Sequence, residues 1–308
     1  MNIKGGILEL IGNTPMVYLD RFGEGLPARI AAKLELFNPY SVKDRPVLAM
    51  IEGAEREGRI TPDTTIIEAT SGNTGLALAF ICAMKGYKLK ICMSEIQSEE
   101  RKQILRLFGA DLELTPAELG TTGSKMRALE LLEEIPDPFY IEQHGNPDNI
   151  RAHIETTAEE LWRDTDGKID IFVPALGTTG TAMGVAEVIK KRKPSFKVIG
   201  TEPHIAPMIS KGIFRPHRQA GTSPGFIPKL LDRSKIDEII TVTEEQAFET
   251  CRELVRKEGL MVGITSGMNA FAARELAKLP ENEGKLIVPL FADTGQRYLS
   301  VQGLYDVS

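Results

Sequence analysis

The 308-residue sequence is poor in cysteine and histidine, with three of the first and four of the second. The cysteines are odd in number and lack C-x-x-C spacing, which favours buried inert thiols over a disulfide framework or a zinc site. The histidines show no metal-ligand spacing, so we expect them to be structural or solvated. They are His144, His153, His204 and His217. These scarcities favour a reducing cytoplasm and a site without metal.

A strong charge of one sign and a long apolar segment are also missing. The net charge is -6, and 26% of the residues are charged. This balance provides no electrostatic reason to bind nucleic acid or an anionic membrane. The first residues contain no apolar stretch typical of a signal peptide, and no segment approaches the length that spans a bilayer. We therefore expect a cytoplasmic protein that acts on a small molecule.

The length and the hydrophobic pattern indicate an α/β protein with two lobes. A chain of 308 residues with 42% hydrophobic residues exceeds the size at which one core usually keeps growing. From about residue 64, short β-branched runs alternate with amphipathic stretches. Strands are expected at 64–70, 88–93, 111–115, 139–143, 169–176, 196–202 and 286–291. Helices are expected at 46–51, 74–85, 98–108, 123–135, 156–162, 181–192, 244–258 and 267–279.

This rhythm predicts parallel sheets covered by helices. The segment 203–228 shows no periodicity. It is longer than most connections in a compact domain, so we expect it to be functional or mobile.

A glycine- and threonine-rich turn follows one apolar strand and opens a helix. Its residues are Gly177, Thr178, Thr179, Gly180 and Thr181. Small residues let backbone N–H groups approach a phosphate, and the helix dipole adds to the attraction. A glycine-rich turn without a ligand is the alternative, since these residues are common in connections. The turn is neither a Walker loop nor a GxGxxG dinucleotide motif.

A second strand-to-helix turn is dense in hydrogen-bonding side chains around two glycines. It consists of Thr70, Ser71, Gly72, Asn73, Thr74 and Gly75. Backbone amides at a helix N-terminus together with hydroxyl groups suit a carboxylate, which would orient an α-amino acid for proton removal. The alternative is a helix cap, because caps use the same residue types.

One lysine, Lys43, lies in a turn just before the apolar helix expected at 46–51. Most lysines are solvated surface charges, and alone Lys43 would be one. A desolvated amine, however, can form an imine with an aldehyde cofactor whose phosphate needs a cradle elsewhere in the chain. The combination of the three segments therefore predicts more than any one of them.

Together the segments resemble the cysteine synthase and cystathionine β-synthase group of pyridoxal phosphate (PLP) enzymes. The family pattern N-P-x-G-S-V-K-D-R is similar to residues 38–45, T-S-G-N-T-G to 70–75, and G-T-[GT]-G-T to 177–181. Further matches are Ile11-Gly12-Asn13-Thr14-Pro15, Gln143 with Asn146-Pro147-Asp148-Asn149, Gly225-Phe226-Ile227-Pro228, Thr265-Ser266-Gly267, and 293–300. The residues at 68–74, 146–149 and 177–181 are most similar to the cysteine synthase B subgroup.

The resemblance implies PLP fold type II, which is tryptophan synthase β-like, with two open, mostly parallel sheets flanked by helices. Residues 1–36 and 143–308 would form a large PLP-binding domain, and residues 37–142 a small mobile domain. A homodimer and a possible serine acetyltransferase partner also come from the family alone.

The resemblance also implies roles for individual residues. Lys43 would carry PLP as an imine and then remove the α-proton, while Asn73 would bind the phenolic oxygen of the ring. Ser266 would face the ring nitrogen, where a neutral hydroxyl cannot keep that nitrogen protonated as an aspartate would. The residues expected around the phosphate are Gly177, Thr178, Thr179, Gly180 and Thr181. Those expected around the substrate are Thr70, Ser71, Gly72, Thr74, Gln143, Thr222 and Ser223.

The family pattern is broken in two places that bear on substrate choice. Only Tyr40 stands between Pro39 and Ser41, where the family usually has two residues ending in glycine. The run 221–225, Gly-Thr-Ser-Pro-Gly, replaces the usual G-I-G-A-G near the expected β-leaving group.

The resulting prediction is a β-replacement enzyme that makes cysteine and acetate from O-acetylserine and sulfide. The reaction would pass through elimination to an aminoacrylate, followed by addition of sulfide or a thiol. An alternative enzyme releases sulfide from cysteine. An alternative of another class is a non-catalytic partner of serine acetyltransferase. The sequence leaves the physiological donor, O-acetylserine, O-phosphoserine or cysteine, open.

Overall fold

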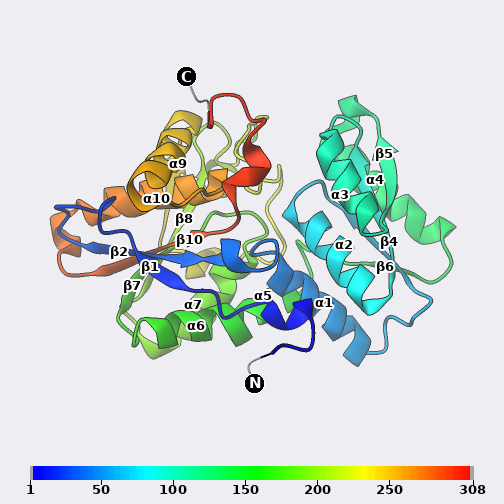
Figure 1. The fold of residues 1–308 in the computed structure, drawn as a ribbon, viewed down its shortest axis with the longest axis horizontal. Helices are drawn as coiled ribbons and strands as arrows, with labels where there is room; N and C mark the ends of the chain where they lie inside the picture. Colours follow the sequence, from blue (N-terminus) through cyan, green and yellow to red (C-terminus); the bar gives the residue numbers. More distant parts are fainter. Residues whose placement is uncertain (1–2, 306–308) are drawn as a thin grey trace. The chain divides into compact units, whose positions relative to one another are not determined.

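A computed structural model describes residues 3–305, which form two compact units. The smaller unit contains residues 3–10 and 43–149, and the larger unit contains residues 11–42 and 150–305. The α/β class with two mostly parallel sheets is confirmed (Figure 1). The expected domain boundaries near 37 and 142 fall a few residues before those of the units. The assignment of a mobile domain and a PLP-binding domain stays a prediction.

The smaller unit is built on a four-stranded, all-parallel sheet of order β5-β4-β3-β6. Its strands are β3 (Thr65–Ala69), β4 (Lys88–Ser94), β5 (Asp111–Thr115) and β6 (Pro138–Tyr140). Its helices are α1 (Asp44–Arg56), α2 (Asn73–Lys85), α3 (Glu99–Leu107) and α4 (Gly120–Glu134), and α5 (Asp148–Ala152) begins at its end. Helix α4 packs on β3 and β4 through Ala128 and Leu131, which meet Ile67 and Cys92.

The larger unit is built on a six-stranded sheet of order β1-β2-β10-β7-β8-β9, in which only β1 is antiparallel to its neighbour. Its strands are β1 (Met16–Tyr18), β2 (Arg29–Leu34), β7 (Ile169–Val173), β8 (Lys197–Pro203), β9 (Glu238–Val242) and β10 (Leu286–Phe291). Its helices are α6 (Ala158–Asp164), α7 (Gly180–Arg192), α8 (Met208–Lys211), α9 (Glu244–Glu258) and α10 (Ile264–Ala277). A π-helical turn, His153–Thr157, joins α5 to α6.

Helices bury both faces of this sheet. Figure 1 shows α9 and α10 on one side of it and α6 and α7 on the other. Along β7, Ile171 and Val173 join the core under α9 and α10, whereas Phe172 joins the core under α6 and α7. A strand buried on both faces is apolar throughout, which is the pattern that made β7 and β10 visible in the sequence.

The sequence analysis named no strand before residue 64 and none at 238–242, and so missed β1, β2 and β9. Strand β2 has the sequence RIAAKL, whose two alanines and terminal arginine weaken the β-branched signal. Three helices begin at least three residues earlier than expected: α4 starts at Gly120, α10 starts at Ile264, and the 156–162 helix belongs to a run from Asp148 to Asp164. The segment 203–228 is irregular except for the short α8, as expected.

A fully buried lysine on β2 holds the N-terminal part of the larger unit together. The Lys33 ammonium donates to Glu160 Oε2 at 2.7 Å and to the Thr14 carbonyl oxygen at 2.7 Å. The other Glu160 oxygen accepts from the Asn13 backbone N–H at 2.8 Å. Beside them, Glu35 Oε1 accepts from the Thr14 hydroxyl at 2.6 Å. Each buried charge therefore has a partner of opposite charge or a hydrogen bond.

Six short 3₁₀ turns complete the described chain: Ile7–Leu10, Glu35–Phe37, Ala117–Leu119, Arg233–Lys235, Pro280–Asn282 and Gly295–Tyr298. Between residues 3 and 305, no helix combines the length and the apolar composition needed to cross a bilayer. The same residues contain no cluster of side chains suited to a metal ion.

We predict that Lys33→Met destabilises the protein by about 3 to 5 kcal/mol, because it leaves the Glu160 carboxylate buried without its cation. Urea unfolding would measure this loss. Lys168→Ala is the control: its ion pair with Asp166 spans 3.7 Å between side chains that are 77% and 83% exposed, so the change should stay within about 0.5 kcal/mol. An equal effect of the two substitutions would contradict the role given to Lys33.

Candidate active site

The predicted phosphate cradle lies in the larger unit between β7 and α7. The backbone of Thr179, the residue before α7, is left-handed with φ of 69°, and no side chain caps the helix. The Thr179 hydroxyl oxygen is buried and has no partner among the described residues. A buried hydroxyl without a partner is costly, and here it lies at a helix N-terminus, where an anion is stabilised. These residues therefore fit the phosphate of PLP.

A neighbouring loop, 219–225, lies against the cradle. A Cβ atom added at Gly177 would stand 2.3 Å from the Gly221 carbonyl oxygen, so only glycine fits there. The Ser223 backbone N–H donates to the Leu176 carbonyl at 3.2 Å. The connection from β7 to α7 and the loop between α8 and β9 are thereby joined at the carboxyl end of β7.

The loop uses the protons of both hydroxyls that the sequence assigned to the substrate. The Thr222 hydroxyl donates to the Gln219 carbonyl at 2.7 Å, and the Ser223 hydroxyl donates to the Ala206 carbonyl at 2.7 Å. Both side chains are buried, and the Ser223 backbone has a φ of 39°. The oxygens remain able to accept a hydrogen bond, and the assignment to the substrate stays a prediction.

His153, one of the four histidines treated as structural or solvated, touches the cradle. Its Nε2 lies 3.2 Å from the Thr181 hydroxyl, and its Nδ1 lies 2.9 Å from the Thr157 hydroxyl. Gly184 makes room for it, since a Cβ atom at that position would stand 2.6 Å from the histidine Cβ. The available signal was the i, i+4 spacing of His153 and Thr157 together with a glycine in the next helix.

Ser266 lies in the first turn of α10 and is completely buried. Its hydroxyl oxygen accepts a hydrogen bond from the Ala292 backbone N–H at 3.0 Å. Because that bond uses a lone pair, the hydroxyl proton is left to be donated to an acceptor such as a pyridine nitrogen. The cradle, the 219–225 loop and α10 also meet: a Cβ atom at Gly221 would lie 3.6 Å from Thr265 Cγ2.

Lys43 belongs to the smaller unit, where it immediately precedes α1. Its carbonyl oxygen accepts the first helical bond, from the Val47 N–H at 3.1 Å. Burial, together with the positive charges of Lys43 and Lys125, lowers the pKa of His144 to about 4. The neighbouring His144 is therefore neutral at physiological pH and adds no charge beside the lysine.

The predicted carboxylate turn joins β3 to α2 in the same unit. The Thr74 hydroxyl donates to Gln143 Oε1 at 2.7 Å, although the two residues are 69 positions apart. This bond orients the carboxamide so that its NH2 end, a donor, is the end available to a carboxylate. Asn73 is the first residue of α2, and Gly72 has open space around it, with nothing within 4 Å of an added Cβ.

The structure thus assembles the predicted residues in two groups. The smaller unit contains Lys43, Thr70, Ser71, Gly72, Asn73, Thr74 and Gln143. The larger unit contains Gly177, Thr178, Thr179, Gly180, Thr181, Thr222, Ser223 and Ser266.

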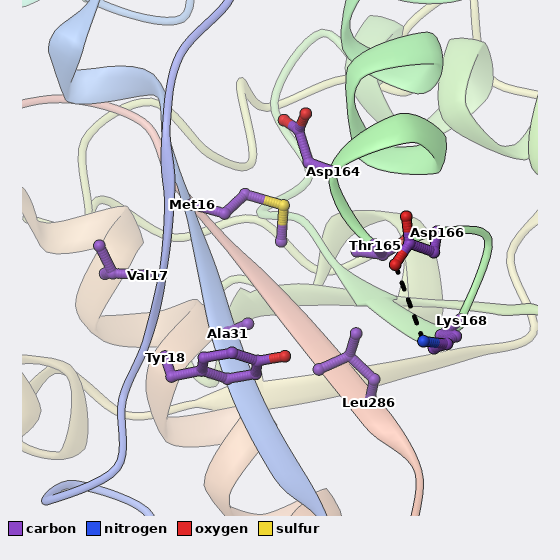
Figure 2. Close-up of a pocket in the computed structure, with 9 residues that line it drawn as sticks. All are labelled: Met16, Val17, Tyr18, Ala31, Asp164, Thr165, Asp166, Lys168 and Leu286. Carbon is purple, nitrogen blue, oxygen red and sulfur yellow. Dashed lines mark ion pairs between the residues drawn. The ribbon is translucent and has the colours of Figure 1, made fainter.

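A cavity of about 180 Å³ in the larger unit lies elsewhere, beside Tyr18, Lys168 and Leu286 (Figure 2). Lys168 precedes β7 and Leu286 begins β10. The cavity is therefore at the amino ends of the strands, whereas ligands of α/β sheets collect at the carboxyl ends.

The sequence matches the family described as pyridoxal-phosphate dependent enzyme over residues 7–293. The chain belongs to this family, and its cofactor is PLP.

Among individual proteins, cysteine synthase B of Campylobacter jejuni is 46% identical over 97% of this chain and 98% of its own. The crystal structure of a cysteine synthase (OASS) from Entamoeba histolytica is 41% identical, with a TM-score of 0.96 over 100% of this chain and 93% of that one. A hydrogen sulfide-producing enzyme from Fusobacterium nucleatum is 42% identical, with a TM-score of 0.92 over 96% of this chain and 100% of its own. The chain is therefore an enzyme of the cysteine synthase type.

We predict that Gly177→Ala lowers PLP occupancy several-fold, because the new methyl group must displace either the cradle or the Gly221 carbonyl. The absorbance of bound PLP relative to protein would measure occupancy. Gly6→Ala is the control, since nothing lies within 4 Å of a Cβ atom there. Full occupancy in the Gly177→Ala protein would contradict the assignment of 177–181 to the phosphate.

Proposed function

We propose that this protein is a cysteine synthase that exchanges the acetate of O-acetylserine for sulfide. The observation that carries the proposal is the buried Ser266 hydroxyl, which can donate a hydrogen bond but cannot supply a charge. A neutral partner weakens the cofactor ring as an electron sink, which favours loss of the α-proton coupled to departure of a β-substituent. The similarity to cysteine synthases along nearly the whole chain supports the same reaction.

The residues of the larger unit would hold the cofactor. The backbone N–H groups of 177–181 and the unpartnered Thr179 hydroxyl would bind the phosphate. His153 would keep the Thr181 hydroxyl in place from the adjacent helical run. Ser266 would donate to the ring nitrogen. PLP, when bound, supplies the electron withdrawal that makes the α-proton of an amino acid acidic.

The residues of the smaller unit would act on the amino acid. Lys43 Nζ would bind the cofactor aldehyde and, once displaced by the incoming amine, would take the proton from Cα. Asn73 would donate to the phenolic oxygen of the ring. The substrate carboxylate would be bound by Thr70, Ser71, Gly72, Thr74 and Gln143. A neutral His144 beside Lys43 would leave that amine as the base.

A second candidate reaction is the release of sulfide from cysteine. The solved structure of a hydrogen sulfide-producing enzyme is similar over almost the whole chain. The altered run 221–225 is the place where a different β-substituent would be selected. From the family resemblance we also propose a homodimer, a serine acetyltransferase partner and a cytoplasmic location. The same resemblance supports the division into a mobile domain, 37–142, and a PLP-binding domain.

We predict that the purified protein is yellow and forms cysteine from O-acetylserine and sulfide. Lys43→Ala should lower this activity by about 10³-fold or more and abolish the imine absorbance, because both the cofactor link and the base are lost. Lys168→Ala should leave both unchanged. Incubation with cysteine alone, followed by assay of sulfide, tests the second reaction. Absence of cysteine formation in a PLP-loaded protein would refute the synthase proposal, and full activity of Lys43→Ala would refute the role of Lys43.

A further inference from the structure

Strands β3 and β6 separate at their carboxyl ends, and a buried carboxylate fills the gap. The last main-chain bond between them runs from the Ile141 N–H to the Ile67 carbonyl at 3.1 Å. The chain then turns at Glu142, whose φ is 52°. The N–H of Gln143, two residues after Ile141, donates at 3.1 Å to Glu68 Oε2 rather than to the main chain of β3.

The same carboxylate closes the end of its own strand. Glu68 Oε1 accepts from the Ala69 N–H at 2.8 Å, and the residue is only 2% exposed. The Tyr140 hydroxyl donates a third hydrogen bond to it. One side chain thus accepts from two backbone N–H groups, one buried and one partly buried, that would otherwise lack acceptors.

Both of these backbone groups lead directly into the proposed carboxylate site. Ala69 precedes Thr70, the first residue of the turn. Gln143 contributes the carboxamide that Thr74 orients, and its carbonyl oxygen accepts from Asn149 Nδ2 at 2.8 Å. Glu68 is therefore close in the chain to the 70–75 turn, and its carboxylate is hydrogen-bonded to Gln143, the other part of that site.

We propose that Glu68, in its ionised form, is a positioning residue that holds the 70–75 turn and Gln143 in register for the substrate carboxylate. This inference rests on the proposed function, since it concerns the site that would bind the amino acid. Glu68 acts through Ala69 and Gln143 and does not itself bind the substrate.

The charge state of Glu68 changes near neutral pH. Burial raises the pKa of Glu68 to about 7, against the opposing effect of the hydrogen bonds from Gln143, Ala69 and Tyr140. The charge of Glu142 adds to the rise. On β4, burial raises the pKa of Cys92 to about 12, so its thiol stays neutral. Because the Glu68 pKa is raised, the carboxyl group is mostly protonated at pH 6 and mostly ionised at pH 8.

Ionisation strengthens the anchor. A carboxylate accepts hydrogen bonds with both oxygens, and bonds to an ionised acceptor are roughly twice as strong as neutral ones. A protonated carboxyl group has one weak acceptor and needs an acceptor for its own proton. Amino-acid binding should therefore depend more on Glu68 at pH 8 than at pH 6.

The test is the substitution Glu68→Gln in the PLP-loaded enzyme, with L-alanine as the probe. L-Alanine has the carboxylate and amine of a substrate but no β-leaving group, so calorimetry measures its binding without turnover. The carboxamide NH2 of the new glutamine cannot accept a hydrogen bond, so the N–H of either Ala69 or Gln143 loses its partner. The dissociation constant should rise about tenfold at pH 8 and by a smaller factor at pH 6.

Asp137→Asn is the matched control. Asp137 joins the same two strands at their amino ends, where its carboxylate accepts from the Thr64 hydroxyl at 2.6 Å and the Thr61 hydroxyl at 3.2 Å. It should leave L-alanine binding within about twofold of wild type, because its bonds lie at the end remote from the turn. Equal losses in the two variants, or a Glu68→Gln effect below about twofold or independent of pH, would overturn the proposal.

Tyr140→Phe provides a second variant that keeps the Glu68 carboxyl group and removes one donor to its ionised form. The step in L-alanine affinity should move to higher pH, and an unmoved step would overturn the proposal even if Glu68→Gln did not fold. The probe also separates this inference from the synthase assignment. A wild-type protein that forms no cysteine but binds L-alanine with the expected dependence on Glu68 would refute the synthase assignment alone.

Discussion

Helices bury both faces of the larger unit's sheet, and this constraint decides where chemistry can occur there. With β7 and β10 enclosed on each side, the polar groups that must meet a ligand are confined to the ends of the strands. At the carboxyl end of β7 the cradle 177–181, the 219–225 loop and the first turn of α10 come together. A small cavity beside Tyr18 and Lys168 lies at the opposite end (Figure 2). The proposed phosphate site suits this geometry, since a helix N-terminus stabilises an anion and small residues gather at that end of α7.

Buried charge is handled differently in the two units. Lys33 is neutralised by Glu160 and has backbone partners as well, so its contribution is to fix the segment around Thr14. Glu68 instead accepts hydrogen bonds from backbone N–H groups and from the Tyr140 hydroxyl, and these donors offset part of the cost of its burial. The first arrangement pairs a buried carboxylate with a cation, whereas the second leaves a carboxyl group whose pKa is raised by burial. A structural ion pair and a positioning carboxylate are therefore distinguished by what compensates the buried charge.

The sequence allowed the strand-turn-helix units at 64–85 and 169–192 to be predicted within a few residues. Apolar runs and glycine-rich turns are local signals, and both units are continuous in the chain. Strand β2 was not predicted because Arg29 and Lys33 interrupt its apolar pattern. The partner that allows Lys33 to be buried, Glu160, is 127 residues away in the chain. The contact of His153 with Thr181 was not predicted for a similar reason. It depends on a π-helical turn and on the space left by Gly184, which has no side chain.

The sequence by itself determined the chemical class of this protein. Lys43, the 70–75 turn and the 177–181 turn are short continuous segments, and their combination resembles the pattern of the PLP family. Only the tertiary structure decided how those residues are held. The structure joins Thr74 to Gln143, Ser223 to Ala206 and Glu68 to Gln143, and these positions are distant in the chain. The bond from the Thr222 hydroxyl to the Gln219 carbonyl depends on the path of the loop. Hydrogen bonds reach only about 3 Å, and contacts of that range between distant residues are created by folding alone.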